Sequence, residues 1–142
     1  MVYNVLVVDD SRTMRSVIKK TILASGINVD EFYEAANGIE ALAVLRNHRL
    51  DIILTDFNMP HMDGMELLRE VKKDEQLKTI PVVVTSVEGS RRRVDAFMAQ
   101  GAAGYIKKPF TPEQARDKLN HVLGVNSNGE TKTAASGESL DF

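Results

Sequence analysis

VLVVDDS, residues 5–11, joins four consecutive aliphatic residues to two adjacent carboxylates. A continuous apolar run of this kind is typical of a parallel strand that is buried on both faces. Asp9 and Asp10 follow at its end, and two carboxylates about 5 Å apart repel by roughly 3 kcal/mol at an effective dielectric near 20. We therefore expect a positive group beside this pair.

The rest of the chain alternates between strand and helix patterns. Helical spacing of apolar residues occurs within 14–22, Ile39–Arg46, 67–71, 94–101 and 115–123. The last helix should begin after Thr111, because TPEQ supplies a capping residue, a proline at the first position and a capping-box glutamine. The strand patterns lie at Tyr3–Val8, Val29–Ala35, Asp51–Thr55, Pro81–Ser86 and Gly104–Lys107.

The polarity of these strands predicts their order. VLVV, IIL and PVVV are continuous apolar runs and belong inside the sheet, whereas VDEFYEA and GYIKK carry charges and suit its edges. The predicted fold is α/β, a doubly wound five-stranded parallel sheet in the flavodoxin-like order 2-1-3-4-5, with helices on both faces. In this topology a ligand binds at the carboxyl ends of strands 1 and 3, where the winding reverses.

The composition excludes several classes of protein. The 142 residues include 18 basic and 20 acidic side chains, for a net charge of −2, so no overall attraction to nucleic acid or to an anionic membrane is expected. The chain has no cysteine and therefore no disulfide or thiolate metal site. No apolar run approaches the length of a membrane span, and the first residues do not resemble a secretory leader. We expect a cytoplasmic protein.

A third carboxylate belongs to the predicted ligand site. Asp56 ends the third strand, beside the strand that Asp9 and Asp10 follow. The chain contains neither G-x-G-x-x-G nor G-x-x-x-x-G-K, the glycine-rich loops that receive phosphate. Three carboxylates favour a hard divalent cation, Mg²⁺ foremost, so the positive group expected beside Asp9 and Asp10 is a metal ion. A metal in an acid cluster can recruit a phosphoryl group.

Two further residues are expected at the same edge of the sheet. Thr85 ends the fourth strand and Lys108 follows the fifth. A hydroxyl and an ammonium beside a carboxylate and a cation form a cradle for the oxygens of a transferring phosphoryl group. Asp56 would then be the nucleophile and would form an acyl phosphate.

Four motifs in this order, VLVVDDS, DIILTDFNMPHMDG, VVVTS and GYIKKPF, resemble the receiver domain of two-component response regulators, from about residue 3 to residue 124. The resemblance implies that Asp56 is the phosphoacceptor. It implies that Asp10 binds Mg²⁺ directly, that Asp9 acts mostly through a water, and that the backbone carbonyl of Asn58 is the remaining protein ligand.

The same resemblance implies roles around the phosphoryl group. Lys108 would pair with it, across a Lys108–Pro109 bond that is often cis in the family, and Thr85 and Tyr105 would be the switch pair. Asn58 and Val87 occupy the two positions that tune dephosphorylation, and Val87 is apolar where an acid is common in chemotaxis members. The phosphodonor would be a histidine kinase, and a protein target would bind the face made by the fourth helix, fifth strand and fifth helix.

Some of these residues also have a purely structural interpretation. Asp9 and Asp10 resemble a helix cap. Asp63 is expected to cap the third helix, and His61 to be an exposed loop residue. Arg91–Arg93 is expected to be a solvated first turn of the fourth helix, with a basic patch for an acidic partner as the alternative.

The end of the chain differs from the rest. Residues 125–142, VNSNGETKTAASGESLDF, lose periodicity and predict a flexible tail after a receiver domain at 1–124. The leading hypothesis is a stand-alone response regulator that signals by phosphorylation-dependent protein binding and is not otherwise an enzyme. One alternative is a severed receiver domain of a larger, for example DNA-binding, regulator. The other is a Mg²⁺-dependent aspartyl-phosphate phosphatase, although the haloacid-dehalogenase type requires an aspartate where Asn58 stands.

Overall fold

The computed structural model describes residues 1–87 and 90–124. Its five strands are parallel and lie in the order β2-β1-β3-β4-β5, which confirms the predicted topology. The strands are β1 (Tyr3–Val8), β2 (Val29–Ala35), β3 (Ile52–Thr55), β4 (Val82–Ser86) and β5 (Gly104–Lys107), and the helices are α1 (Arg12–Ala24), α2 (Gly38–Asn47), α3 (Gly64–Lys73), α4 (Arg91–Ala99) and α5 (Pro112–Leu123).

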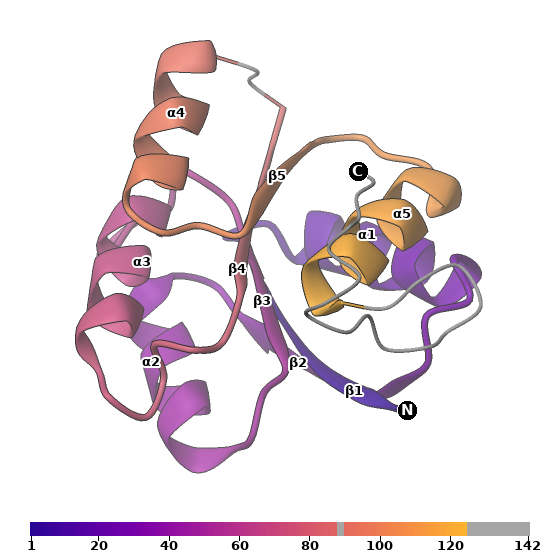
Figure 1. Ribbon diagram of the computed structural model, residues 1–142, viewed down its shortest axis with the longest axis horizontal. Helices are drawn as coiled ribbons and strands as arrows, with labels where there is room; N and C mark the ends of the chain where they lie inside the picture. The colour runs from indigo at the N-terminus through magenta and orange to yellow at the C-terminus, as the bar shows by residue number, and fades with distance from the viewer. Residues whose placement is uncertain (88–89, 125–142) are drawn as a thin grey trace, which may run out of the picture.

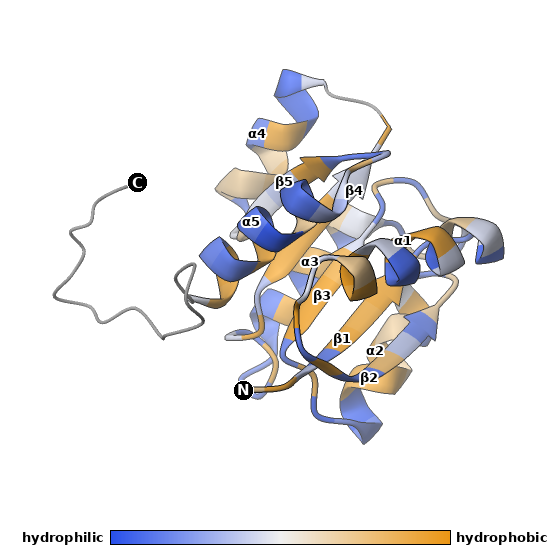
Figure 2. Ribbon diagram, turned by 90° about the vertical axis from the view of Figure 1, so that its right-hand side faces the viewer, coloured by the Kyte–Doolittle hydropathy of each residue, from blue (hydrophilic) through white to orange (hydrophobic). Residues whose placement is uncertain are grey.

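Helices cover both faces of the sheet. Figure 1 shows α1 and α5 on one side and α2, α3 and α4 on the other. The side chains of β1 alternate between the two cores: Leu6 packs with α2 and α3, and Val7 packs against Ile18 of α1. Both are fully buried, and Figure 2 shows the central strands as the most hydrophobic part of the chain. Because both faces of β1 are buried, apolar and polar residues do not alternate in VLVV.

Backbone hydrogen bonds align the carboxyl ends of the strands. The Asp9 N–H donates to the carbonyl of Ala35 at 3.0 Å, and the Asp56 N–H donates to the carbonyl of Val8 at 3.0 Å. The hydrogen bonding between β1 and β2 therefore extends to Asp9, and that between β3 and β1 extends to Asp56. The parallel register places Asp9 and Asp56 on adjacent strand ends at the same edge of the sheet.

The helix caps show which acidic residues have a structural role. Ser11, not Asp9 or Asp10, caps α1, because its side chain accepts from the N–H of Met14 at 3.1 Å. The interpretation of the acid pair as a helix cap is therefore wrong. Asp63 caps α3 in a capping box with Glu66, as predicted.

Thr111 caps α5 in a second capping box with Gln114, and a proline occupies the first turn, as TPEQ predicted. This confirms the start of the last helix. Two strands begin one residue later than predicted. The Asp51 N–H donates to the carbonyl of Asn4 at 2.9 Å, but the Asn4 N–H donates at 2.8 Å to the Asp51 carboxylate and not to a strand carbonyl. Pro81 has no N–H to donate to a ladder.

None of the helices within 1–87 and 90–124 is long and apolar enough to cross a membrane. The predicted tail at 125–142 lies outside the described residues. The last described helix, α5, is capped at its C-terminus by Gly124, whose φ of 76° is left-handed, a conformation that favours glycine.

Candidate metal centre and its surroundings

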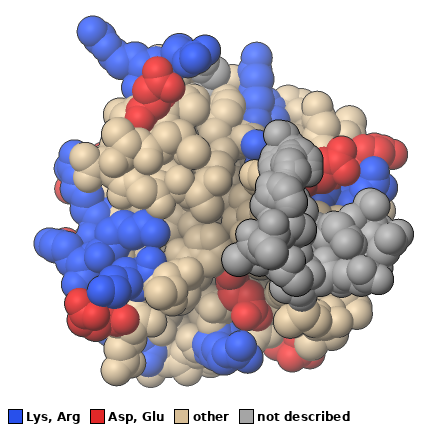
Figure 3. All heavy atoms as spheres, in the orientation of Figure 1, with Lys and Arg blue, Asp and Glu red and all other residues tan. Residues whose placement is uncertain are grey.

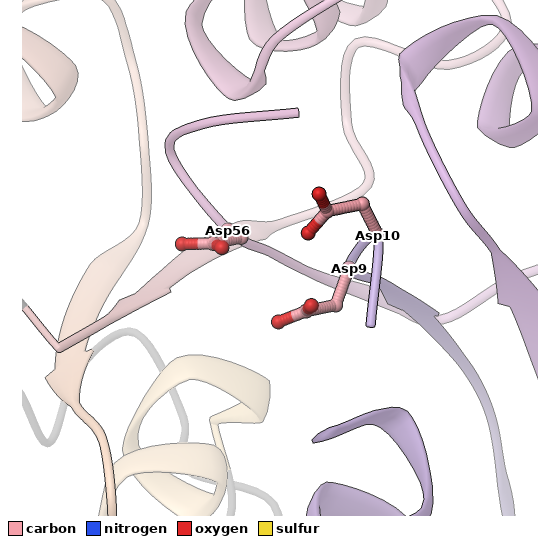
Figure 4. A group of neighbouring side chains, drawn as sticks. All are labelled: Asp9, Asp10 and Asp56. Atoms are coloured by element: carbon pink, nitrogen blue, oxygen red, sulfur yellow. The ribbon is translucent and has the colours of Figure 1, made fainter. Parts of the chain in front are cut away.

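Three carboxylates meet at the carboxyl edge of the sheet. One oxygen from each of Asp9, Asp10 and Asp56 lies within 4.8 Å of the others. Figure 4 shows the three side chains gathered at the ends of β1 and β3. Asp9 is buried, Asp56 is partly buried and Asp10 is exposed, so the cluster opens to solvent on the side of Asp10.

A buried lysine supplies positive charge beside Asp9, where sequence analysis expected a metal ion to do so. The Lys108 ammonium donates to Asp9 Oδ2 at 2.8 Å and lies 3.6 Å from Asp56 Oδ2. The Lys108 and Asp9 side chains are only 5% and 3% exposed, and an ion pair removed from water in this way depends on good geometry. The remaining Asp9 oxygen, Oδ1, accepts from the N–H of Ser11 at 2.9 Å. The peptide bond between Lys108 and Pro109 is cis, as expected.

The surroundings of Asp56 raise the pKa of its carboxyl overall, through influences that act in both directions. Burial raises the pKa of its carboxyl above the ordinary value, and the Asp9 charge acts in the same direction. The Lys108 charge and a 2.8 Å hydrogen bond from the Phe57 N–H to Asp56 Oδ1 oppose that rise in pKa. A carboxylate poised by such opposing influences is a common feature of reactive sites.

The backbone of Asp56 is in close contact with the start of α3. A Cβ atom at Gly64 would lie 2.2 Å from the carbonyl oxygen of Asp56, so only glycine fits there. The Gly64 N–H also donates to the carbonyl of Phe57 at 2.9 Å. Helix α3 and the acidic strand end are therefore held together through backbone atoms.

Thr85 lies at the end of β4 with a buried hydroxyl. The residue is 1% exposed, and its Oγ1 has no hydrogen-bond partner among the described residues. Leaving a buried hydroxyl without a partner costs about 1–3 kcal/mol. An incoming group with acceptor oxygens would satisfy it.

Tyr105 lies one strand away, in β5, paired with Val84 in the sheet register. Its ring is partly buried, with its centroid 6.3 Å from that of Phe57, and burial raises the pKa of its hydroxyl. The structure thus places Thr85 and Tyr105 on adjacent strands.

Phe57 and Asn58, in the connection after β3, contact Arg93 of α4, and sequence analysis did not predict these contacts. Asn58 is exposed, and its Oδ1 accepts from Arg93 of α4 at 2.9 Å. The Arg93 guanidinium also lies over the Phe57 ring, 4.4 Å from its centroid. The prediction that all of Arg91–Arg93 is solvated is therefore wrong for Arg93. Val87, after β4, is 61% exposed.

No local pattern could have revealed the Arg93 contact, because 35 residues separate Arg93 from Asn58. The prediction that His61 is an exposed loop residue is confirmed. Its φ of 69° is left-handed. His48 ends α2, and its ring lies 4.4 Å from that of Tyr33.

The chemistry of this site suits a hard divalent cation and a phosphoryl group. Carboxylate oxygens from three aspartates form a donor set that Mg²⁺ prefers. The Lys108 ammonium and the unpartnered Thr85 hydroxyl border the same edge of the sheet and can both donate to phosphoryl oxygens. The structure brings the three aspartates and Lys108 together at this edge, with Thr85 near the end of the neighbouring strand β4.

Comparison with known proteins agrees with this geometry. Residues 5–120 match the family model described as the response regulator receiver domain. The chemotaxis protein CheY1 of Helicobacter pylori is 41% identical over 122 residues, covering 85% of this chain and 97% of that protein. A chemotaxis protein CheY homolog of Campylobacter jejuni is 40% identical over 123 residues, covering 86% and 93%.

Solved structures give the same result. The chemotaxis response regulator CheY4 of Vibrio cholerae superposes with a TM-score of 0.74 at 36% identity, covering 86% of this chain and 99% of that one. A response regulator from Chloroflexus aurantiacus superposes with a TM-score of 0.78 at 27% identity, covering 87% and 98%. The acidic cluster lies at the edge of the sheet where a fold of this topology binds ligands. The chain therefore belongs to the response regulator receiver domain family.

Proposed function

We propose that this receiver domain accepts a phosphoryl group on Asp56 from a histidine kinase, with Mg²⁺, and signals by binding a protein target when phosphorylated. The observation that carries the proposal is the surroundings of Asp56. Its carboxylate lies beside two further aspartates and 3.6 Å from a buried ammonium. The Thr85 hydroxyl, on the next strand, has no hydrogen-bond partner among the described residues. Each of these groups matches one need of phosphoryl transfer.

The chemical step uses the carboxylate of Asp56 as the nucleophile. One of its oxygens forms a bond to phosphorus while the bond from phosphorus to the donor imidazole nitrogen breaks, and the electron pair stays on that nitrogen. Asp9, Asp10, Asp56 and the backbone carbonyl of Asn58 would hold the metal. When bound, Mg²⁺ neutralises negative charge on the acids and on the phosphoryl oxygens.

Lys108 and Thr85 would stabilise the product. The Lys108 ammonium lies 3.6 Å from Asp56 Oδ2, so a phosphoryl group on that side chain comes within its reach. The Thr85 hydroxyl would donate to a phosphoryl oxygen and so gain the partner it lacks. In this proposal Thr85 moves toward the phosphoryl group, and the space it leaves favours an inward position of the Tyr105 ring. Phosphorylation thereby shifts an existing equilibrium between outward and inward positions of Tyr105.

The target would bind the face made by α4, β5 and α5. A groove of about 730 Å³ lies along the β5 and α5 part of this face, with Tyr105, Lys107, Lys118 and His121 among its lining residues. Its basic side chains suit a partner segment with acidic residues. The relatives are named chemotaxis proteins, so we propose a target in a chemotaxis pathway.

Phosphorylation can be tested with a small donor. Acetyl phosphate with Mg²⁺ should add one acid-stable, base-labile phosphoryl group, which peptide mass analysis should locate on Asp56. Asp56→Asn should abolish it. Asp63→Asn is the matched control, because Asp63 caps α3 and asparagine caps equally well. A phosphoryl group found elsewhere would contradict the assignment.

The metal can be tested separately. Titration with Mg²⁺ should perturb the backbone amides of Asp10, Asp56 and Asn58, and Asp10→Ala should weaken binding at least about tenfold, since it removes a directly coordinating charge. Equal Mg²⁺ affinity in Asp10→Ala and wild type would show that the metal binds elsewhere.

A further inference from the structure

Arg93 differs from the two arginines that precede it. Arg91 and Arg92 are exposed, and Arg91 lies 3.4 Å from Asp95 in its own helix. Figure 3 shows basic side chains at the upper end of the molecule, where α4 begins in Figure 1. Arg93 is partly buried and contacts the connection after β3.

Two contacts of Arg93 fall on Phe57 and Asn58, the two residues that directly follow Asp56. Its Nη2 donates to Asn58 Oδ1 at 2.9 Å, and its guanidinium lies 4.4 Å from the centre of the Phe57 ring. Phe57 is 1% exposed, and its N–H donates to Asp56 Oδ1 at 2.8 Å. A planar guanidinium can stack and donate at once, which an ammonium cannot do with the same geometry.

We propose that Arg93 is a positioning residue that holds the side-chain amide of Asn58 and thereby lengthens the life of the phosphoryl group on Asp56. This inference rests on the proposed function. The phosphoryl group is lost when a water oxygen forms a bond to phosphorus and the bond to the Asp56 oxygen breaks. The electron pair returns to the carboxylate, and the protons of the water leave with inorganic phosphate and solvent.

The direction of the effect follows from which end of the amide Arg93 holds. Asn58 Oδ1 accepts from α4, so the held amide directs its oxygen toward Arg93. When released, the exposed Asn58 side chain can rotate, and its oxygen can accept a hydrogen bond from a water near Asp56. An acceptor that orients the attacking water speeds hydrolysis. Arg93 therefore slows hydrolysis by occupying that acceptor.

The test compares the rate of phosphoryl loss in four variants. Each protein is phosphorylated with acetyl phosphate and Mg²⁺, the donor is removed, and intact mass is followed over time. Arg93→Ala should lose the group at least about threefold faster than wild type, a change of roughly 0.65 kcal/mol in the barrier. Arg92→Ala is the matched control and should decay at the wild-type rate. In an Asn58→Ala background, adding Arg93→Ala should change nothing further.

Each outcome decides the inference. Equal decay in Arg93→Ala and Arg92→Ala overturns it. An Arg93→Ala effect of the same size with and without Asn58 also overturns it, because Arg93 would then act by another route. If wild type forms no acyl phosphate, the proposed function fails and the inference fails with it. Should Arg93→Ala misfold, Arg93→Lys replaces it, because lysine keeps the charge but lacks the planar guanidinium. This variant should also lose the phosphoryl group faster than wild type. Loss at the wild-type rate would overturn the role of the guanidinium.

Discussion

The Thr85 hydroxyl is a buried polar group whose structural cost can be measured. Its Oγ1 has no partner in the described part of the chain, so Thr85→Val should raise the free energy of unfolding by about 1 kcal/mol in the absence of metal and phosphodonor. Thr55→Val is the matched control. Thr55 is equally buried, but its hydroxyl donates to the carbonyl of Asp56 at 3.1 Å, so its loss should cost about 1 kcal/mol.

Urea unfolding of the two variants gives the comparison, and equal destabilisation would mean that the Thr85 hydroxyl has a partner after all. The stabilised variant should still be phosphorylated on Asp56. Amide shifts at Tyr105 on phosphorylation should shrink in it, because the valine has no hydroxyl to follow the phosphoryl oxygens.

Glu34 provides a pH-dependent contribution to stability. Hydrogen bonds from Lys19 and Arg15 lower the pKa of its carboxyl below the ordinary value. A lowered folded-state pKa contributes stability that is fully present above the unfolded-state pKa and is lost as the pH falls through the folded-state pKa. Glu34→Gln should therefore destabilise the protein at pH 7, by no more than about 1 kcal/mol because the site is partly exposed.

The difference between wild type and Glu34→Gln should shrink to zero as the pH falls below 4.5, the ordinary glutamate value, and through the lowered folded-state pKa. Urea unfolding at a series of pH values measures it. A difference that persists unchanged at pH 2 would mean that the glutamine disturbs packing instead of removing a charge.

For single residues, the sequence predicted which side chains lie close together but not which hydrogen bonds and ion pairs they form. Asp9, Asp56 and Lys108 stand at strand ends, and the parallel topology brings strand ends together, so their meeting could be predicted. The preference of Lys108 for Asp9 depends on distances that the pattern does not contain. The Arg93 contact depends on how closely α4 approaches the connection after β3.

Among the elements, the start of α3 tolerates the least change. Gly64→Ala would place Cβ 2.2 Å from the Asp56 carbonyl, a backbone atom that moves only with β3, and should cost about 2–3 kcal/mol. Gly38→Ala, at the start of α2, meets the flexible side chain of Met62 at 2.5 Å and gains helix propensity, so it should cost less than about 1 kcal/mol.

Urea unfolding ranks the two glycine variants. The Gly64 variant should also bind Mg²⁺ more weakly, because displacing the carbonyl moves the Asp56 side chain. A Gly64→Ala protein that is as stable as Gly38→Ala would show that α3 can shift freely relative to β3.

Element boundaries were predictable where a single residue fixes them. TPEQ and Asp63 begin their helices through capping boxes, and both are visible in the sequence. The starts of β3 and β4 were each placed one residue too early. The polar role of Asp51 toward Asn4 is a tertiary contact that no local pattern contains.

At the scale of the whole molecule, the last helix that packs on the sheet, α5, ends before Gly124. The left-handed glycine ends α5, and its N–H donates to the carbonyl of His121 at 3.3 Å. A chain truncated after residue 124 should therefore keep its melting temperature within about 2 °C, since a loss of roughly 1 kcal/mol would lower it by several degrees. Calorimetry of both lengths measures this, and a larger fall would show that residues 125–142 pack on the domain.

The edges of the sheet bear on how the protein behaves when concentrated. β2 forms one edge, and the exposed Asp30 and Glu31 stand along it. If two copies met edge to edge, these acidic rows would face one another, and the repulsion would oppose growth of a continuous sheet into fibres. Salt weakens that repulsion, so crowded solutions of this protein should remain clear at low ionic strength and become less stable toward aggregation as salt is added.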